Sequence, residues 1–336
     1  HRIARRQRQM CIRDRLQIED LSVCFKTDEG EVEALDRVSL EVDHAQTVGV
    51  VGESGCGKSV TAYSVMRLLP RPMGRISSGN IFFEGKNLLD LSADEMQGIR
   101  GNEIGMIFQE PMNALNPVQK IGVQLSEVFE LHQPMEDHQA WSRSVQMLKA
   151  VGIPSPDTRM HEYPHQLSGG MRQRVVIAMA LACRPKLIIA DEPTTALDVT
   201  VQAQILDLLQ NLRKEFSSSI LLITHDLGVI AETCDQVCVM YAGRIVERGP
   251  TIKIFASPRH AYTRDLLASI PQLNGTPKTK LKTIEGIVPG LSDLNTGCRF
   301  GPRSGRAHNQ EVLSQRPEFV EISEGHWVEA CPVCMS

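Results

Sequence analysis

The chain has 336 residues and a formal net charge of −4, with 42% hydrophobic and 23% charged residues. This composition is ordinary for a protein with a sizeable core, and it provides no global basic field that would favour nucleic acid. No apolar run reaches the roughly 18 residues of a membrane-spanning helix, so any association with a membrane is expected to be peripheral. The absence of a secretory-signal pattern and nine mostly scattered cysteines favour a reducing cytoplasm.

The N-terminal third predicts a tail, a hairpin and a strand. Residues 1–15 carry six arginines without a sustained period, and we expect a disordered or extraneous tail, with a basic arm as the alternative. From Leu16, LQIEDLSVCF and ALDRVSLEV flank a polar turn and predict an antiparallel hairpin. TVGVV then predicts a short buried strand that runs into a glycine-rich loop.

That loop, GESGCGKS from Gly52 to Ser59, fits the pattern G-x-x-x-x-G-K-S. In such a loop, backbone N–H groups surround phosphates, Lys58 reaches the β- and γ-phosphates, and the Ser59 hydroxyl ligates Mg²⁺. A chance match is the alternative. It is disfavoured because a predicted strand precedes the loop and a helical pattern follows it.

The rest of the chain predicts an α/β fold with a helical insert. Residues from about 92 to 166 are more polar and helical in pattern, whereas KLIIAD, SSSILLITHD and DQVCVMYAG are continuous apolar runs separated by helices. Such runs are typical of a parallel sheet covered on both faces. From about Ser257 the periodicity weakens, and no regular element is predicted there.

Polar side chains follow several of these strands. Asp191 and Glu192 end LIIADE, at the strand edge where α/β proteins place ligands. Asp191 suits the Mg²⁺ shell and Glu192 suits activating water. His225, after ILLIT, suits the γ-phosphate or the attacking water, and Gln109 suits water or Mg²⁺. The alternative for His225 is a structural histidine, and for Gln109 it is an ordinary surface glutamine. For the two acids it is a position at a strand end without a catalytic role.

The segment LSGGMRQR, residues 167–174, is a second loop suited to an anion. In order, GESGCGKS, IFQEP, LSGGMRQR, LIIADEP, TALD and ITHD resemble the ATPase subunits of ATP-binding cassette (ABC) transporters over roughly residues 16–258. The resemblance implies a P-loop NTPase core with an antiparallel β subdomain and a helical subdomain at about 92–166. It also implies ATP hydrolysis with Mg²⁺, with Glu192 as the general base, His225 as the switch histidine and Gln109 in the Q-loop.

The same resemblance implies which residues contact nucleotide and metal. The expected nucleotide contacts are Phe25, Gly52, Glu53, Ser54, Gly55, Cys56, Gly57, Lys58, Ser59, Val60, Ser168, Gly169, Gly170, Gln173 and Asp198. The expected Mg²⁺ ligands are Ser59, Gln109 and Asp191. In this family the signature loop covers the ATP of a partner ATPase, so Ser168, Gly169 and Gly170 are expected to act in trans.

Three longer stretches refine the resemblance: IFQEPMNALNPV, the run from YPHQLSGG to AQIL, and SPRHAYTRDLLASIP. With GCRF-x-PR they resemble subunits of oligopeptide, dipeptide and nickel importers and imply a C-terminal extension over 259–336. The implied partners are a second, usually non-identical ATPase, two permeases and an extracytoplasmic binding protein, at the cytoplasmic face of the inner membrane and without nucleic acid. We expect a peptide cargo, with nickel and glutathione open.

Two other classes are weaker alternatives. A DNA-repair ABC ATPase inserts long coiled coils or zinc modules between the phosphate loop and the signature. Here about a hundred residues separate the two, without heptads or paired CxxC. An enzyme acting alone on a small molecule is disfavoured because the sequence pattern indicates no binding site for a second substrate.

The cysteines near the C-terminus depart from the subfamily, some members of which are thought to bind an iron–sulfur cluster through four cysteines. Cys298 and Cys331 match two of those positions, Ser304 stands at another, and one is missing. Cys334 completes a CPVC pair. We expect a metal-free extension with reduced thiols; the open alternative is a Cys₃His zinc site completed by His308 or His326.

Overall fold

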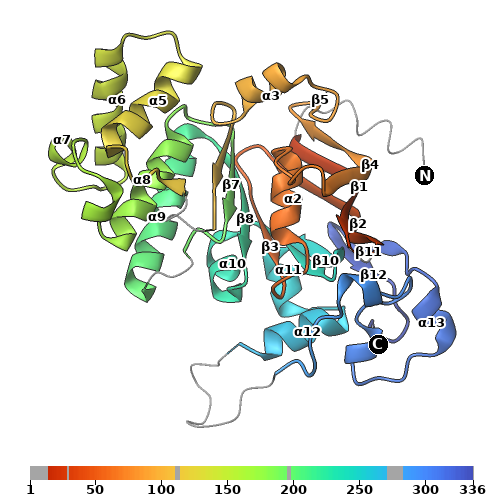
Figure 1. The fold of residues 1–336 in the computed structure, drawn as a ribbon. Coiled ribbons are helices and arrows are strands. Elements are labelled where there is room, and N and C mark those ends of the chain that lie inside the picture. Colours follow the sequence, from red (N-terminus) through yellow and green to blue (C-terminus); the bar gives the residue numbers. More distant parts are fainter. Residues whose placement is uncertain (1–13, 29, 110–113, 195–197, 271–282, 336) are drawn as a thin grey trace. The chain divides into compact units, whose positions relative to one another are not determined.

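The computed structural model describes residues 14–28, 30–109, 114–194, 198–270 and 283–335. Figure 1 draws the fold with its helices and strands labelled. Backbone contacts divide the chain into two units. The first unit comprises residues 1–16, 42–46 and 83–222, and the second comprises 17–41, 47–82 and 223–336. The predicted boundary between residues 258 and 259 therefore falls inside the second unit, and the C-terminal extension is not a unit of its own.

The predicted N-terminal tail ends earlier than expected. Residues 1–13 lie outside the described residues, but Asp14 and Arg15 already belong to strand β1 (Asp14–Thr27). The guanidinium of Arg15 pairs with the carboxylate of Glu84 at 2.5 Å, and Arg15 is buried. The basic composition of the tail gave no indication of this pairing. Asp14 and Arg15, the last two residues of the predicted tail, therefore belong to the fold.

The second unit contains two sheets. In one, β1 lies between β2 (Gly30–Asp43) and β4 (Gly74–Phe83). The predicted strand pair is thus present as neighbouring strands. In β1 and β2 buried hydrophobic side chains largely alternate with more exposed polar ones, which is the pattern of strands that pack one face on a core.

The other sheet of the second unit has the strand order β11-β12-β10-β9-β3. Strand β3 (Thr47–Val51) pairs in parallel with β9 (Gln236–Tyr241), and β10 (Arg244–Pro250) pairs antiparallel with β9. Two strands that the sequence pattern did not predict, β12 (His326–Glu329) and β11 (Phe319–Ser323), continue the sheet beyond β10. They are too short to show a period, and they are held in the sheet by pairing, β12 with β10 and β11 with β12.

The first unit contains the parallel pair β6 (Ile104–Ile107) and β7 (Leu187–Asp191), with β8 (Ser219–Thr224) beside β7. Strand β6 lies within the range predicted as a helical insert, so the prediction of a helical stretch starting near residue 92 is corrected here. The helices of this unit are α3 (Ala93–Ile99), α5 (Ile121–His132), α6 (Asp137–Ala150), α7 (Pro156–Arg159), α8 (Gly169–Leu181) and α9 (Val199–Phe216).

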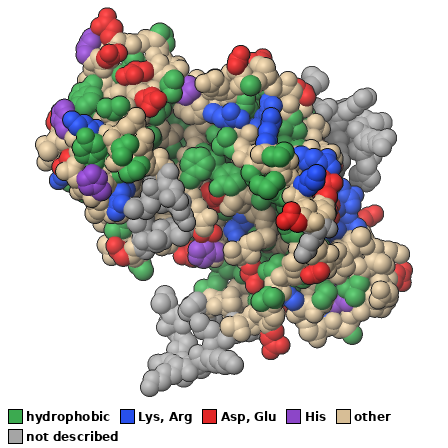
Figure 2. All heavy atoms as spheres, viewed as in Figure 1, with side chains coloured by type: hydrophobic (Ala, Val, Ile, Leu, Met, Phe, Trp, Pro, Cys, Tyr) green, Lys and Arg blue, Asp and Glu red, His purple; other side chains and the backbone are tan. Residues whose placement is uncertain are grey.

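The second unit carries short helices between its strands and after them. They are α2 (Lys58–Val65), α10 (Leu227–Thr233), α11 (Thr251–Ala256), α12 (Ala261–Ala268) and α13 (Gln310–Ser314). None of the helices among the described residues is both long and apolar enough to cross a membrane. Acidic and basic side chains both occur on the face drawn in Figure 2, as expected for a net charge of −4.

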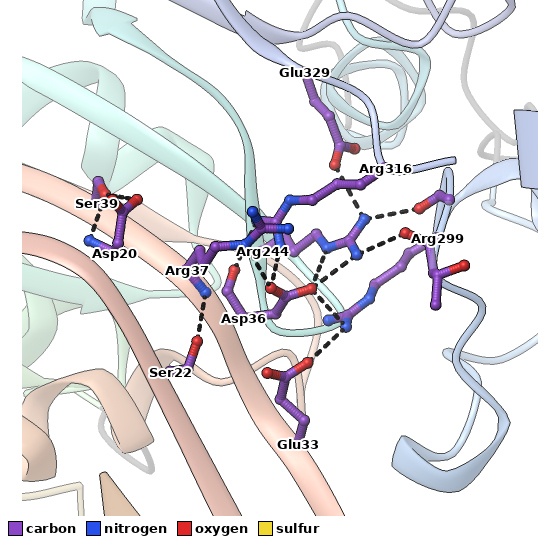
Figure 3. Close-up of polar contacts among 12 residues, drawn as sticks. Asp20, Ser22, Glu33, Asp36, Arg37, Ser39, Arg244, Arg299, Arg316 and Glu329 are labelled. Carbon is purple, nitrogen blue, oxygen red and sulfur yellow. Dashed lines mark hydrogen bonds and ion pairs between the residues drawn. The ribbon is translucent and has the colours of Figure 1, made fainter. Parts of the chain in front are cut away.

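A buried ion cluster links β2 and β10 to the C-terminal segment (Figure 3). The Asp36 carboxylate accepts from Arg244 Nε at 2.8 Å and from Arg299 Nη2 at 3.0 Å, and it also pairs with Arg316. Burial alone would raise the pKa of Asp36, but the guanidiniums lower it to about 2. This carboxylate therefore stays charged and stabilises the packing of residues 299–316 on β2 and β10 within the second unit.

Candidate nucleotide-binding and catalytic site

The phosphate loop joins β3 to α2 as the sequence predicts. Its Lys58 is 5% exposed, and its ammonium group donates to the carbonyl oxygens of Gly52 at 2.8 Å and Glu53 at 3.0 Å. The lysine thus crosses the interior of its own loop. In this position it fixes the curl of the backbone and leaves a cationic centre close to the loop amides.

Glycines are required at two positions of this loop. A Cβ at Gly52 would lie 2.1 Å from the carbonyl oxygen of Met240, and at Gly57 the backbone has φ +105°. Gly57 is the residue before α2, so the left-handed conformation aims the N–H groups of the first helical turn into the loop. Amide donors together with the Lys58 ammonium are the donor set that a polyphosphate needs, so the loop fits ATP.

The first unit brings two predicted catalytic residues together. Asp191 is fully buried at the end of β7, and Glu192 follows it with φ +47°, a left-handed conformation that is unusual for glutamate. The amide nitrogen of Gln109, just beyond β6, donates to Glu192 Oε2 at 3.3 Å. Parallel pairing of β6 with β7 puts the ends of both strands at one edge, which explains why two residues 83 positions apart meet.

The signature segment begins helix α8. Ser168 is its N-cap and accepts from Met171 N at 3.3 Å. A Cβ at Gly169 would meet nothing within 4 Å, so the surrounding described structure does not require glycine there. The absence of a side chain leaves the backbone N–H groups of this helix end open to approach from outside.

Asp198 and His225 lie at element ends. Asp198 is exposed and caps α9 by accepting from Val201 N at 2.9 Å. His225 is exposed directly after β8. Thr195, Ala196 and Leu197 of the TALD motif lie outside the described residues. Both side chains are thus exposed on the units to which they belong.

Comparison with known proteins places these motifs in a family. The family model described as ABC transporter matches residues 35–195, and that described as oligopeptide/dipeptide transporter, C-terminal region, matches 246–310. The oligopeptide transport ATP-binding protein OppD of Bacillus subtilis (strain 168) is 50% identical over 315 residues, covering 94% of this chain and 88% of that protein. OppD of Escherichia coli (strain K12) is 48% identical, covering 94% and 92%.

The chain belongs to the ABC transporter ATPase family. Among solved structures, the ATP-binding cassette MJ0796, dimeric in a post-hydrolysis state with ADP and Pi, is similar at a TM-score of 0.63 and 27% identity. The match covers 70% of this chain and 98% of MJ0796. The α/β fold class and the assignment as an ATP-hydrolysing ABC subunit are therefore confirmed, whereas the role of each site residue stays a prediction.

Two predicted nucleotide contacts of this ABC subunit are engaged within the chain. Gln173 is 1% exposed, and its amide donates to the carbonyl of Pro193. The Gln173 side chain therefore lies in the interior of the unit, where it links α8 to Pro193, the residue after Glu192. Phe25 is half-buried on β1, and its ring would lie 2.9 Å from a Cβ at Gly74. One face of the ring thus packs on the chain, and adenine stacking stays a prediction.

Sequence reasoning missed two residues that contact the phosphate loop. Arg303 holds the Glu53 carboxylate with two hydrogen bonds, Nη1–Oε2 at 2.8 Å and Nη2–Oε1 at 3.1 Å. Glu53 N donates to the hydroxyl oxygen of Tyr262 at 3.0 Å, and burial raises the pKa of this phenol well above its usual value. The stretches that carry them, GPR and HAYT, were singled out only as subfamily resemblance, which carried no indication of a contact.

Proposed function

We propose that this ABC ATPase powers the import of di- and oligopeptides. The observation that carries the proposal is the joint match of both transporter family models to one chain, with relatives named as oligopeptide transport proteins at about half identity over almost the whole length. The contact of Arg303 with Glu53 supports it, because the subfamily-specific C-terminal segment is built onto the nucleotide loop itself.

In the proposed reaction, the loop from Gly52 to Ser59 holds the phosphates of ATP through its amides and Lys58. Mg²⁺, when bound, neutralises phosphate charge, and Ser59, Gln109 and Asp191 are its proposed ligands. Glu192 accepts the proton of the attacking water. The hydrogen bond from Gln109 orients the Glu192 carboxylate, and His225 is proposed to contact the γ-phosphate.

The remaining nucleotide contacts are proposed to act between two ATPase subunits. Ser168, Gly169 and Gly170 would approach the nucleotide of the partner ATPase, with Asp198 at the same interface. The open space around Gly169 supports this role, since an approaching phosphate needs that space. Two permeases and a substrate-binding protein complete the proposed importer, with this subunit peripheral at the cytoplasmic face of the membrane.

The identity of the transported substrate is tested in the assembled importer. The subunit would be co-expressed with candidate permeases and a candidate binding protein, and ATP hydrolysis would be measured in proteoliposomes. Peptide-loaded binding protein is expected to stimulate hydrolysis several-fold, with the Glu192→Gln importer as the inactive control. Stimulation by nickel or glutathione but not by peptides would contradict the peptide proposal and leave the ATPase assignment intact.

A further inference from the structure

Four metal-ligand side chains converge in the C-terminal part of the second unit. The Sγ atoms of Cys298, Cys331 and Cys334 and a ring nitrogen of His308 all lie within 4.8 Å of one another. The three cysteines are fully buried, and His308 is partly buried. Cys298 and His308 come from one segment, and the other two from the CPVC pair at the end of the chain.

Three of the separations match those of a single tetrahedral ion, and the others are within 4.8 Å. The Cys298 and Cys334 sulfurs are 3.6 Å apart, and His308 Nε2 is 3.6 Å from Cys331 Sγ and 3.5 Å from Cys334 Sγ. Tetrahedral zinc, with its usual bond lengths, places two sulfur ligands about 3.8 Å apart and a sulfur and a nitrogen about 3.6 Å apart. A four-iron cluster binds each cysteine to a different iron, and its thiolates must stand farther apart than these atoms do.

The surrounding hydrogen bonds prepare the ligand atoms. Nδ1 of His308 lies 3.0 Å from the carbonyl oxygen of Arg306, which can only accept, so Nδ1 carries the proton and Nε2 presents its lone pair to the sulfurs. A metal-bound histidine usually makes this backbone contact. The backbone N–H of Cys334 donates to Cys331 Sγ at 3.4 Å, an interaction that stabilises a thiolate.

The structure also distinguishes between the two candidate histidines. His326 Nε2 lies 2.8 Å from a carboxylate oxygen of buried Glu247, and it is not part of the cluster. Only His308 reaches the sulfurs. The cysteines that the sequence left as a metal-free set thus acquire a fourth ligand through the turn at Ser304, whose hydroxyl lies 3.4 Å from His308 Nδ1.

We propose that Cys298, His308, Cys331 and Cys334 bind one structural Zn²⁺. All four positions are filled by protein ligands, as in closed structural zinc sites, so the ion is not catalytic. Binding releases the thiol protons and ties residues 298–308 to the chain end. Arg299 and Arg303, which pair with Asp36 and Glu53, both lie in the segment that the ion would hold.

The test is metal analysis of the full chain purified anaerobically without chelator or affinity metal. About one zinc per chain is expected by mass spectrometry, without stoichiometric iron or sulfide. His308→Ala and Cys331→Ser should each lose most of the zinc, and Cys24→Ser, which changes a half-buried cysteine outside the cluster, should retain it. Metal-free wild type, iron with sulfide, or a Cys298–Cys334 disulfide in fresh protein would each overturn the proposal.

If the alanine and serine variants do not fold, a second measurement still tests the site. Cobalt-exchanged wild type should show the intense visible bands of a sulfur-rich tetrahedral site, and His308→Cys should retain the metal with bands shifted towards those of a four-sulfur site. Unchanged bands in His308→Cys would remove His308 from the ligand set and overturn the assignment.

Discussion

The residue that we propose as the general base of this ATPase is Glu192. It adopts a left-handed backbone conformation, and it accepts a hydrogen bond from Gln109. Strained conformations of this kind persist where the surroundings hold them, and they are frequent at active sites. Because of this hydrogen bond, the position of Gln109 affects the orientation of the carboxylate that is proposed to activate water.

Glu192→Gln is expected to bind MgATP normally and to hydrolyse it at least about 100-fold more slowly, because the amide cannot accept a proton from water. Single-turnover hydrolysis and nucleotide binding in the assembled importer measure the two effects. The control is Lys58→Ala, which removes the charge at the phosphates and should weaken binding itself. Near wild-type turnover in Glu192→Gln would exclude this residue as the base.

At the scale of elements, helix α8 begins with two glycines whose surroundings differ. A Cβ at Gly170, the second helical residue, would lie 3.1 Å from a methyl group of Val201, whereas a Cβ at Gly169 would have open space. An aspartate at Gly169 is therefore sterically accommodated, and near a helix N-terminus it would even favour the helix. If such a variant loses ATPase activity, the cause would therefore lie in its contact with the partner ATPase and not in the folding of this subunit.

Gly169→Asp is expected to leave ATP binding by the isolated subunit unchanged and to abolish hydrolysis at one composite site of the importer, because its carboxylate would face a bound γ-phosphate. Binding is measured by titration with labelled ATP, and hydrolysis in proteoliposomes. The matched control is Gly98→Asp, since Gly98 is also an exposed helical glycine with no atom within 4 Å of a Cβ. Weakened binding in the isolated Gly169→Asp subunit would contradict action in trans.

The segment after Cys298 acts on the phosphate loop through Arg303. Its guanidinium neutralises the Glu53 carboxylate, which would otherwise repel the phosphates of ATP. Because the Arg303 side chain is only 6% exposed, the pair is poorly screened by salt. Order in the C-terminal segment is therefore coupled to the charge of the nucleotide loop.

Arg303→Ala is expected to raise the Kd for ATP roughly tenfold, equivalent to about 1.4 kcal/mol. The double variant Arg303→Ala/Glu53→Gln should recover most of the affinity, because no unpaired carboxylate remains. Calorimetric titration of the purified subunit measures both. If the double variant binds as weakly as Arg303→Ala, the effect is one of packing and not of charge.

At the scale of the whole molecule, distant segments of the second unit are joined by charge. Asp36 on β2 accepts from arginines of β10 and of the C-terminal segment, up to 280 residues away (Figure 3). Glu329 on β12 also contacts Arg244 at 3.4 Å. Removing one partner of such a buried network leaves the others uncompensated, which costs more than the net worth of the pairs.

Asp36→Asn is expected to lower the free energy of unfolding at neutral pH by on the order of 3 kcal/mol. The folded-state pKa of Asp36 is about 2, below its ordinary 3.8, so its contribution is present above about pH 4 and is lost as pH falls towards 2. Thermal unfolding between pH 5 and 2 should therefore be less pH-dependent in Asp36→Asn than in wild type. Asp20→Asn, an exposed carboxylate bonded to Ser39, is the control. Parallel wild-type and Asp36→Asn curves would contradict this role.

The sequence by itself determined the phosphate loop, the strand-end acids and the family. These features depend on spacing within a few residues, where backbone geometry follows directly from residue type: glycines at Gly52 and Gly57, and an acid pair after a buried strand. The strands β3, β7, β8 and β9 were likewise predicted from continuous apolar runs, whereas β6 lies within the range predicted as helical and the pairing of the strands was not predicted.

Only the tertiary structure decided what the C-terminal part does. Strand β12 pairs with the edge of β10 and β11 pairs with β12, Arg303 meets Glu53 across 250 residues, and His308 rather than His326 reaches the cysteines. It likewise showed that Gln173 is buried inside its unit. Contacts between residues so far apart in the chain depend on packing, and local periodicity carries no record of them.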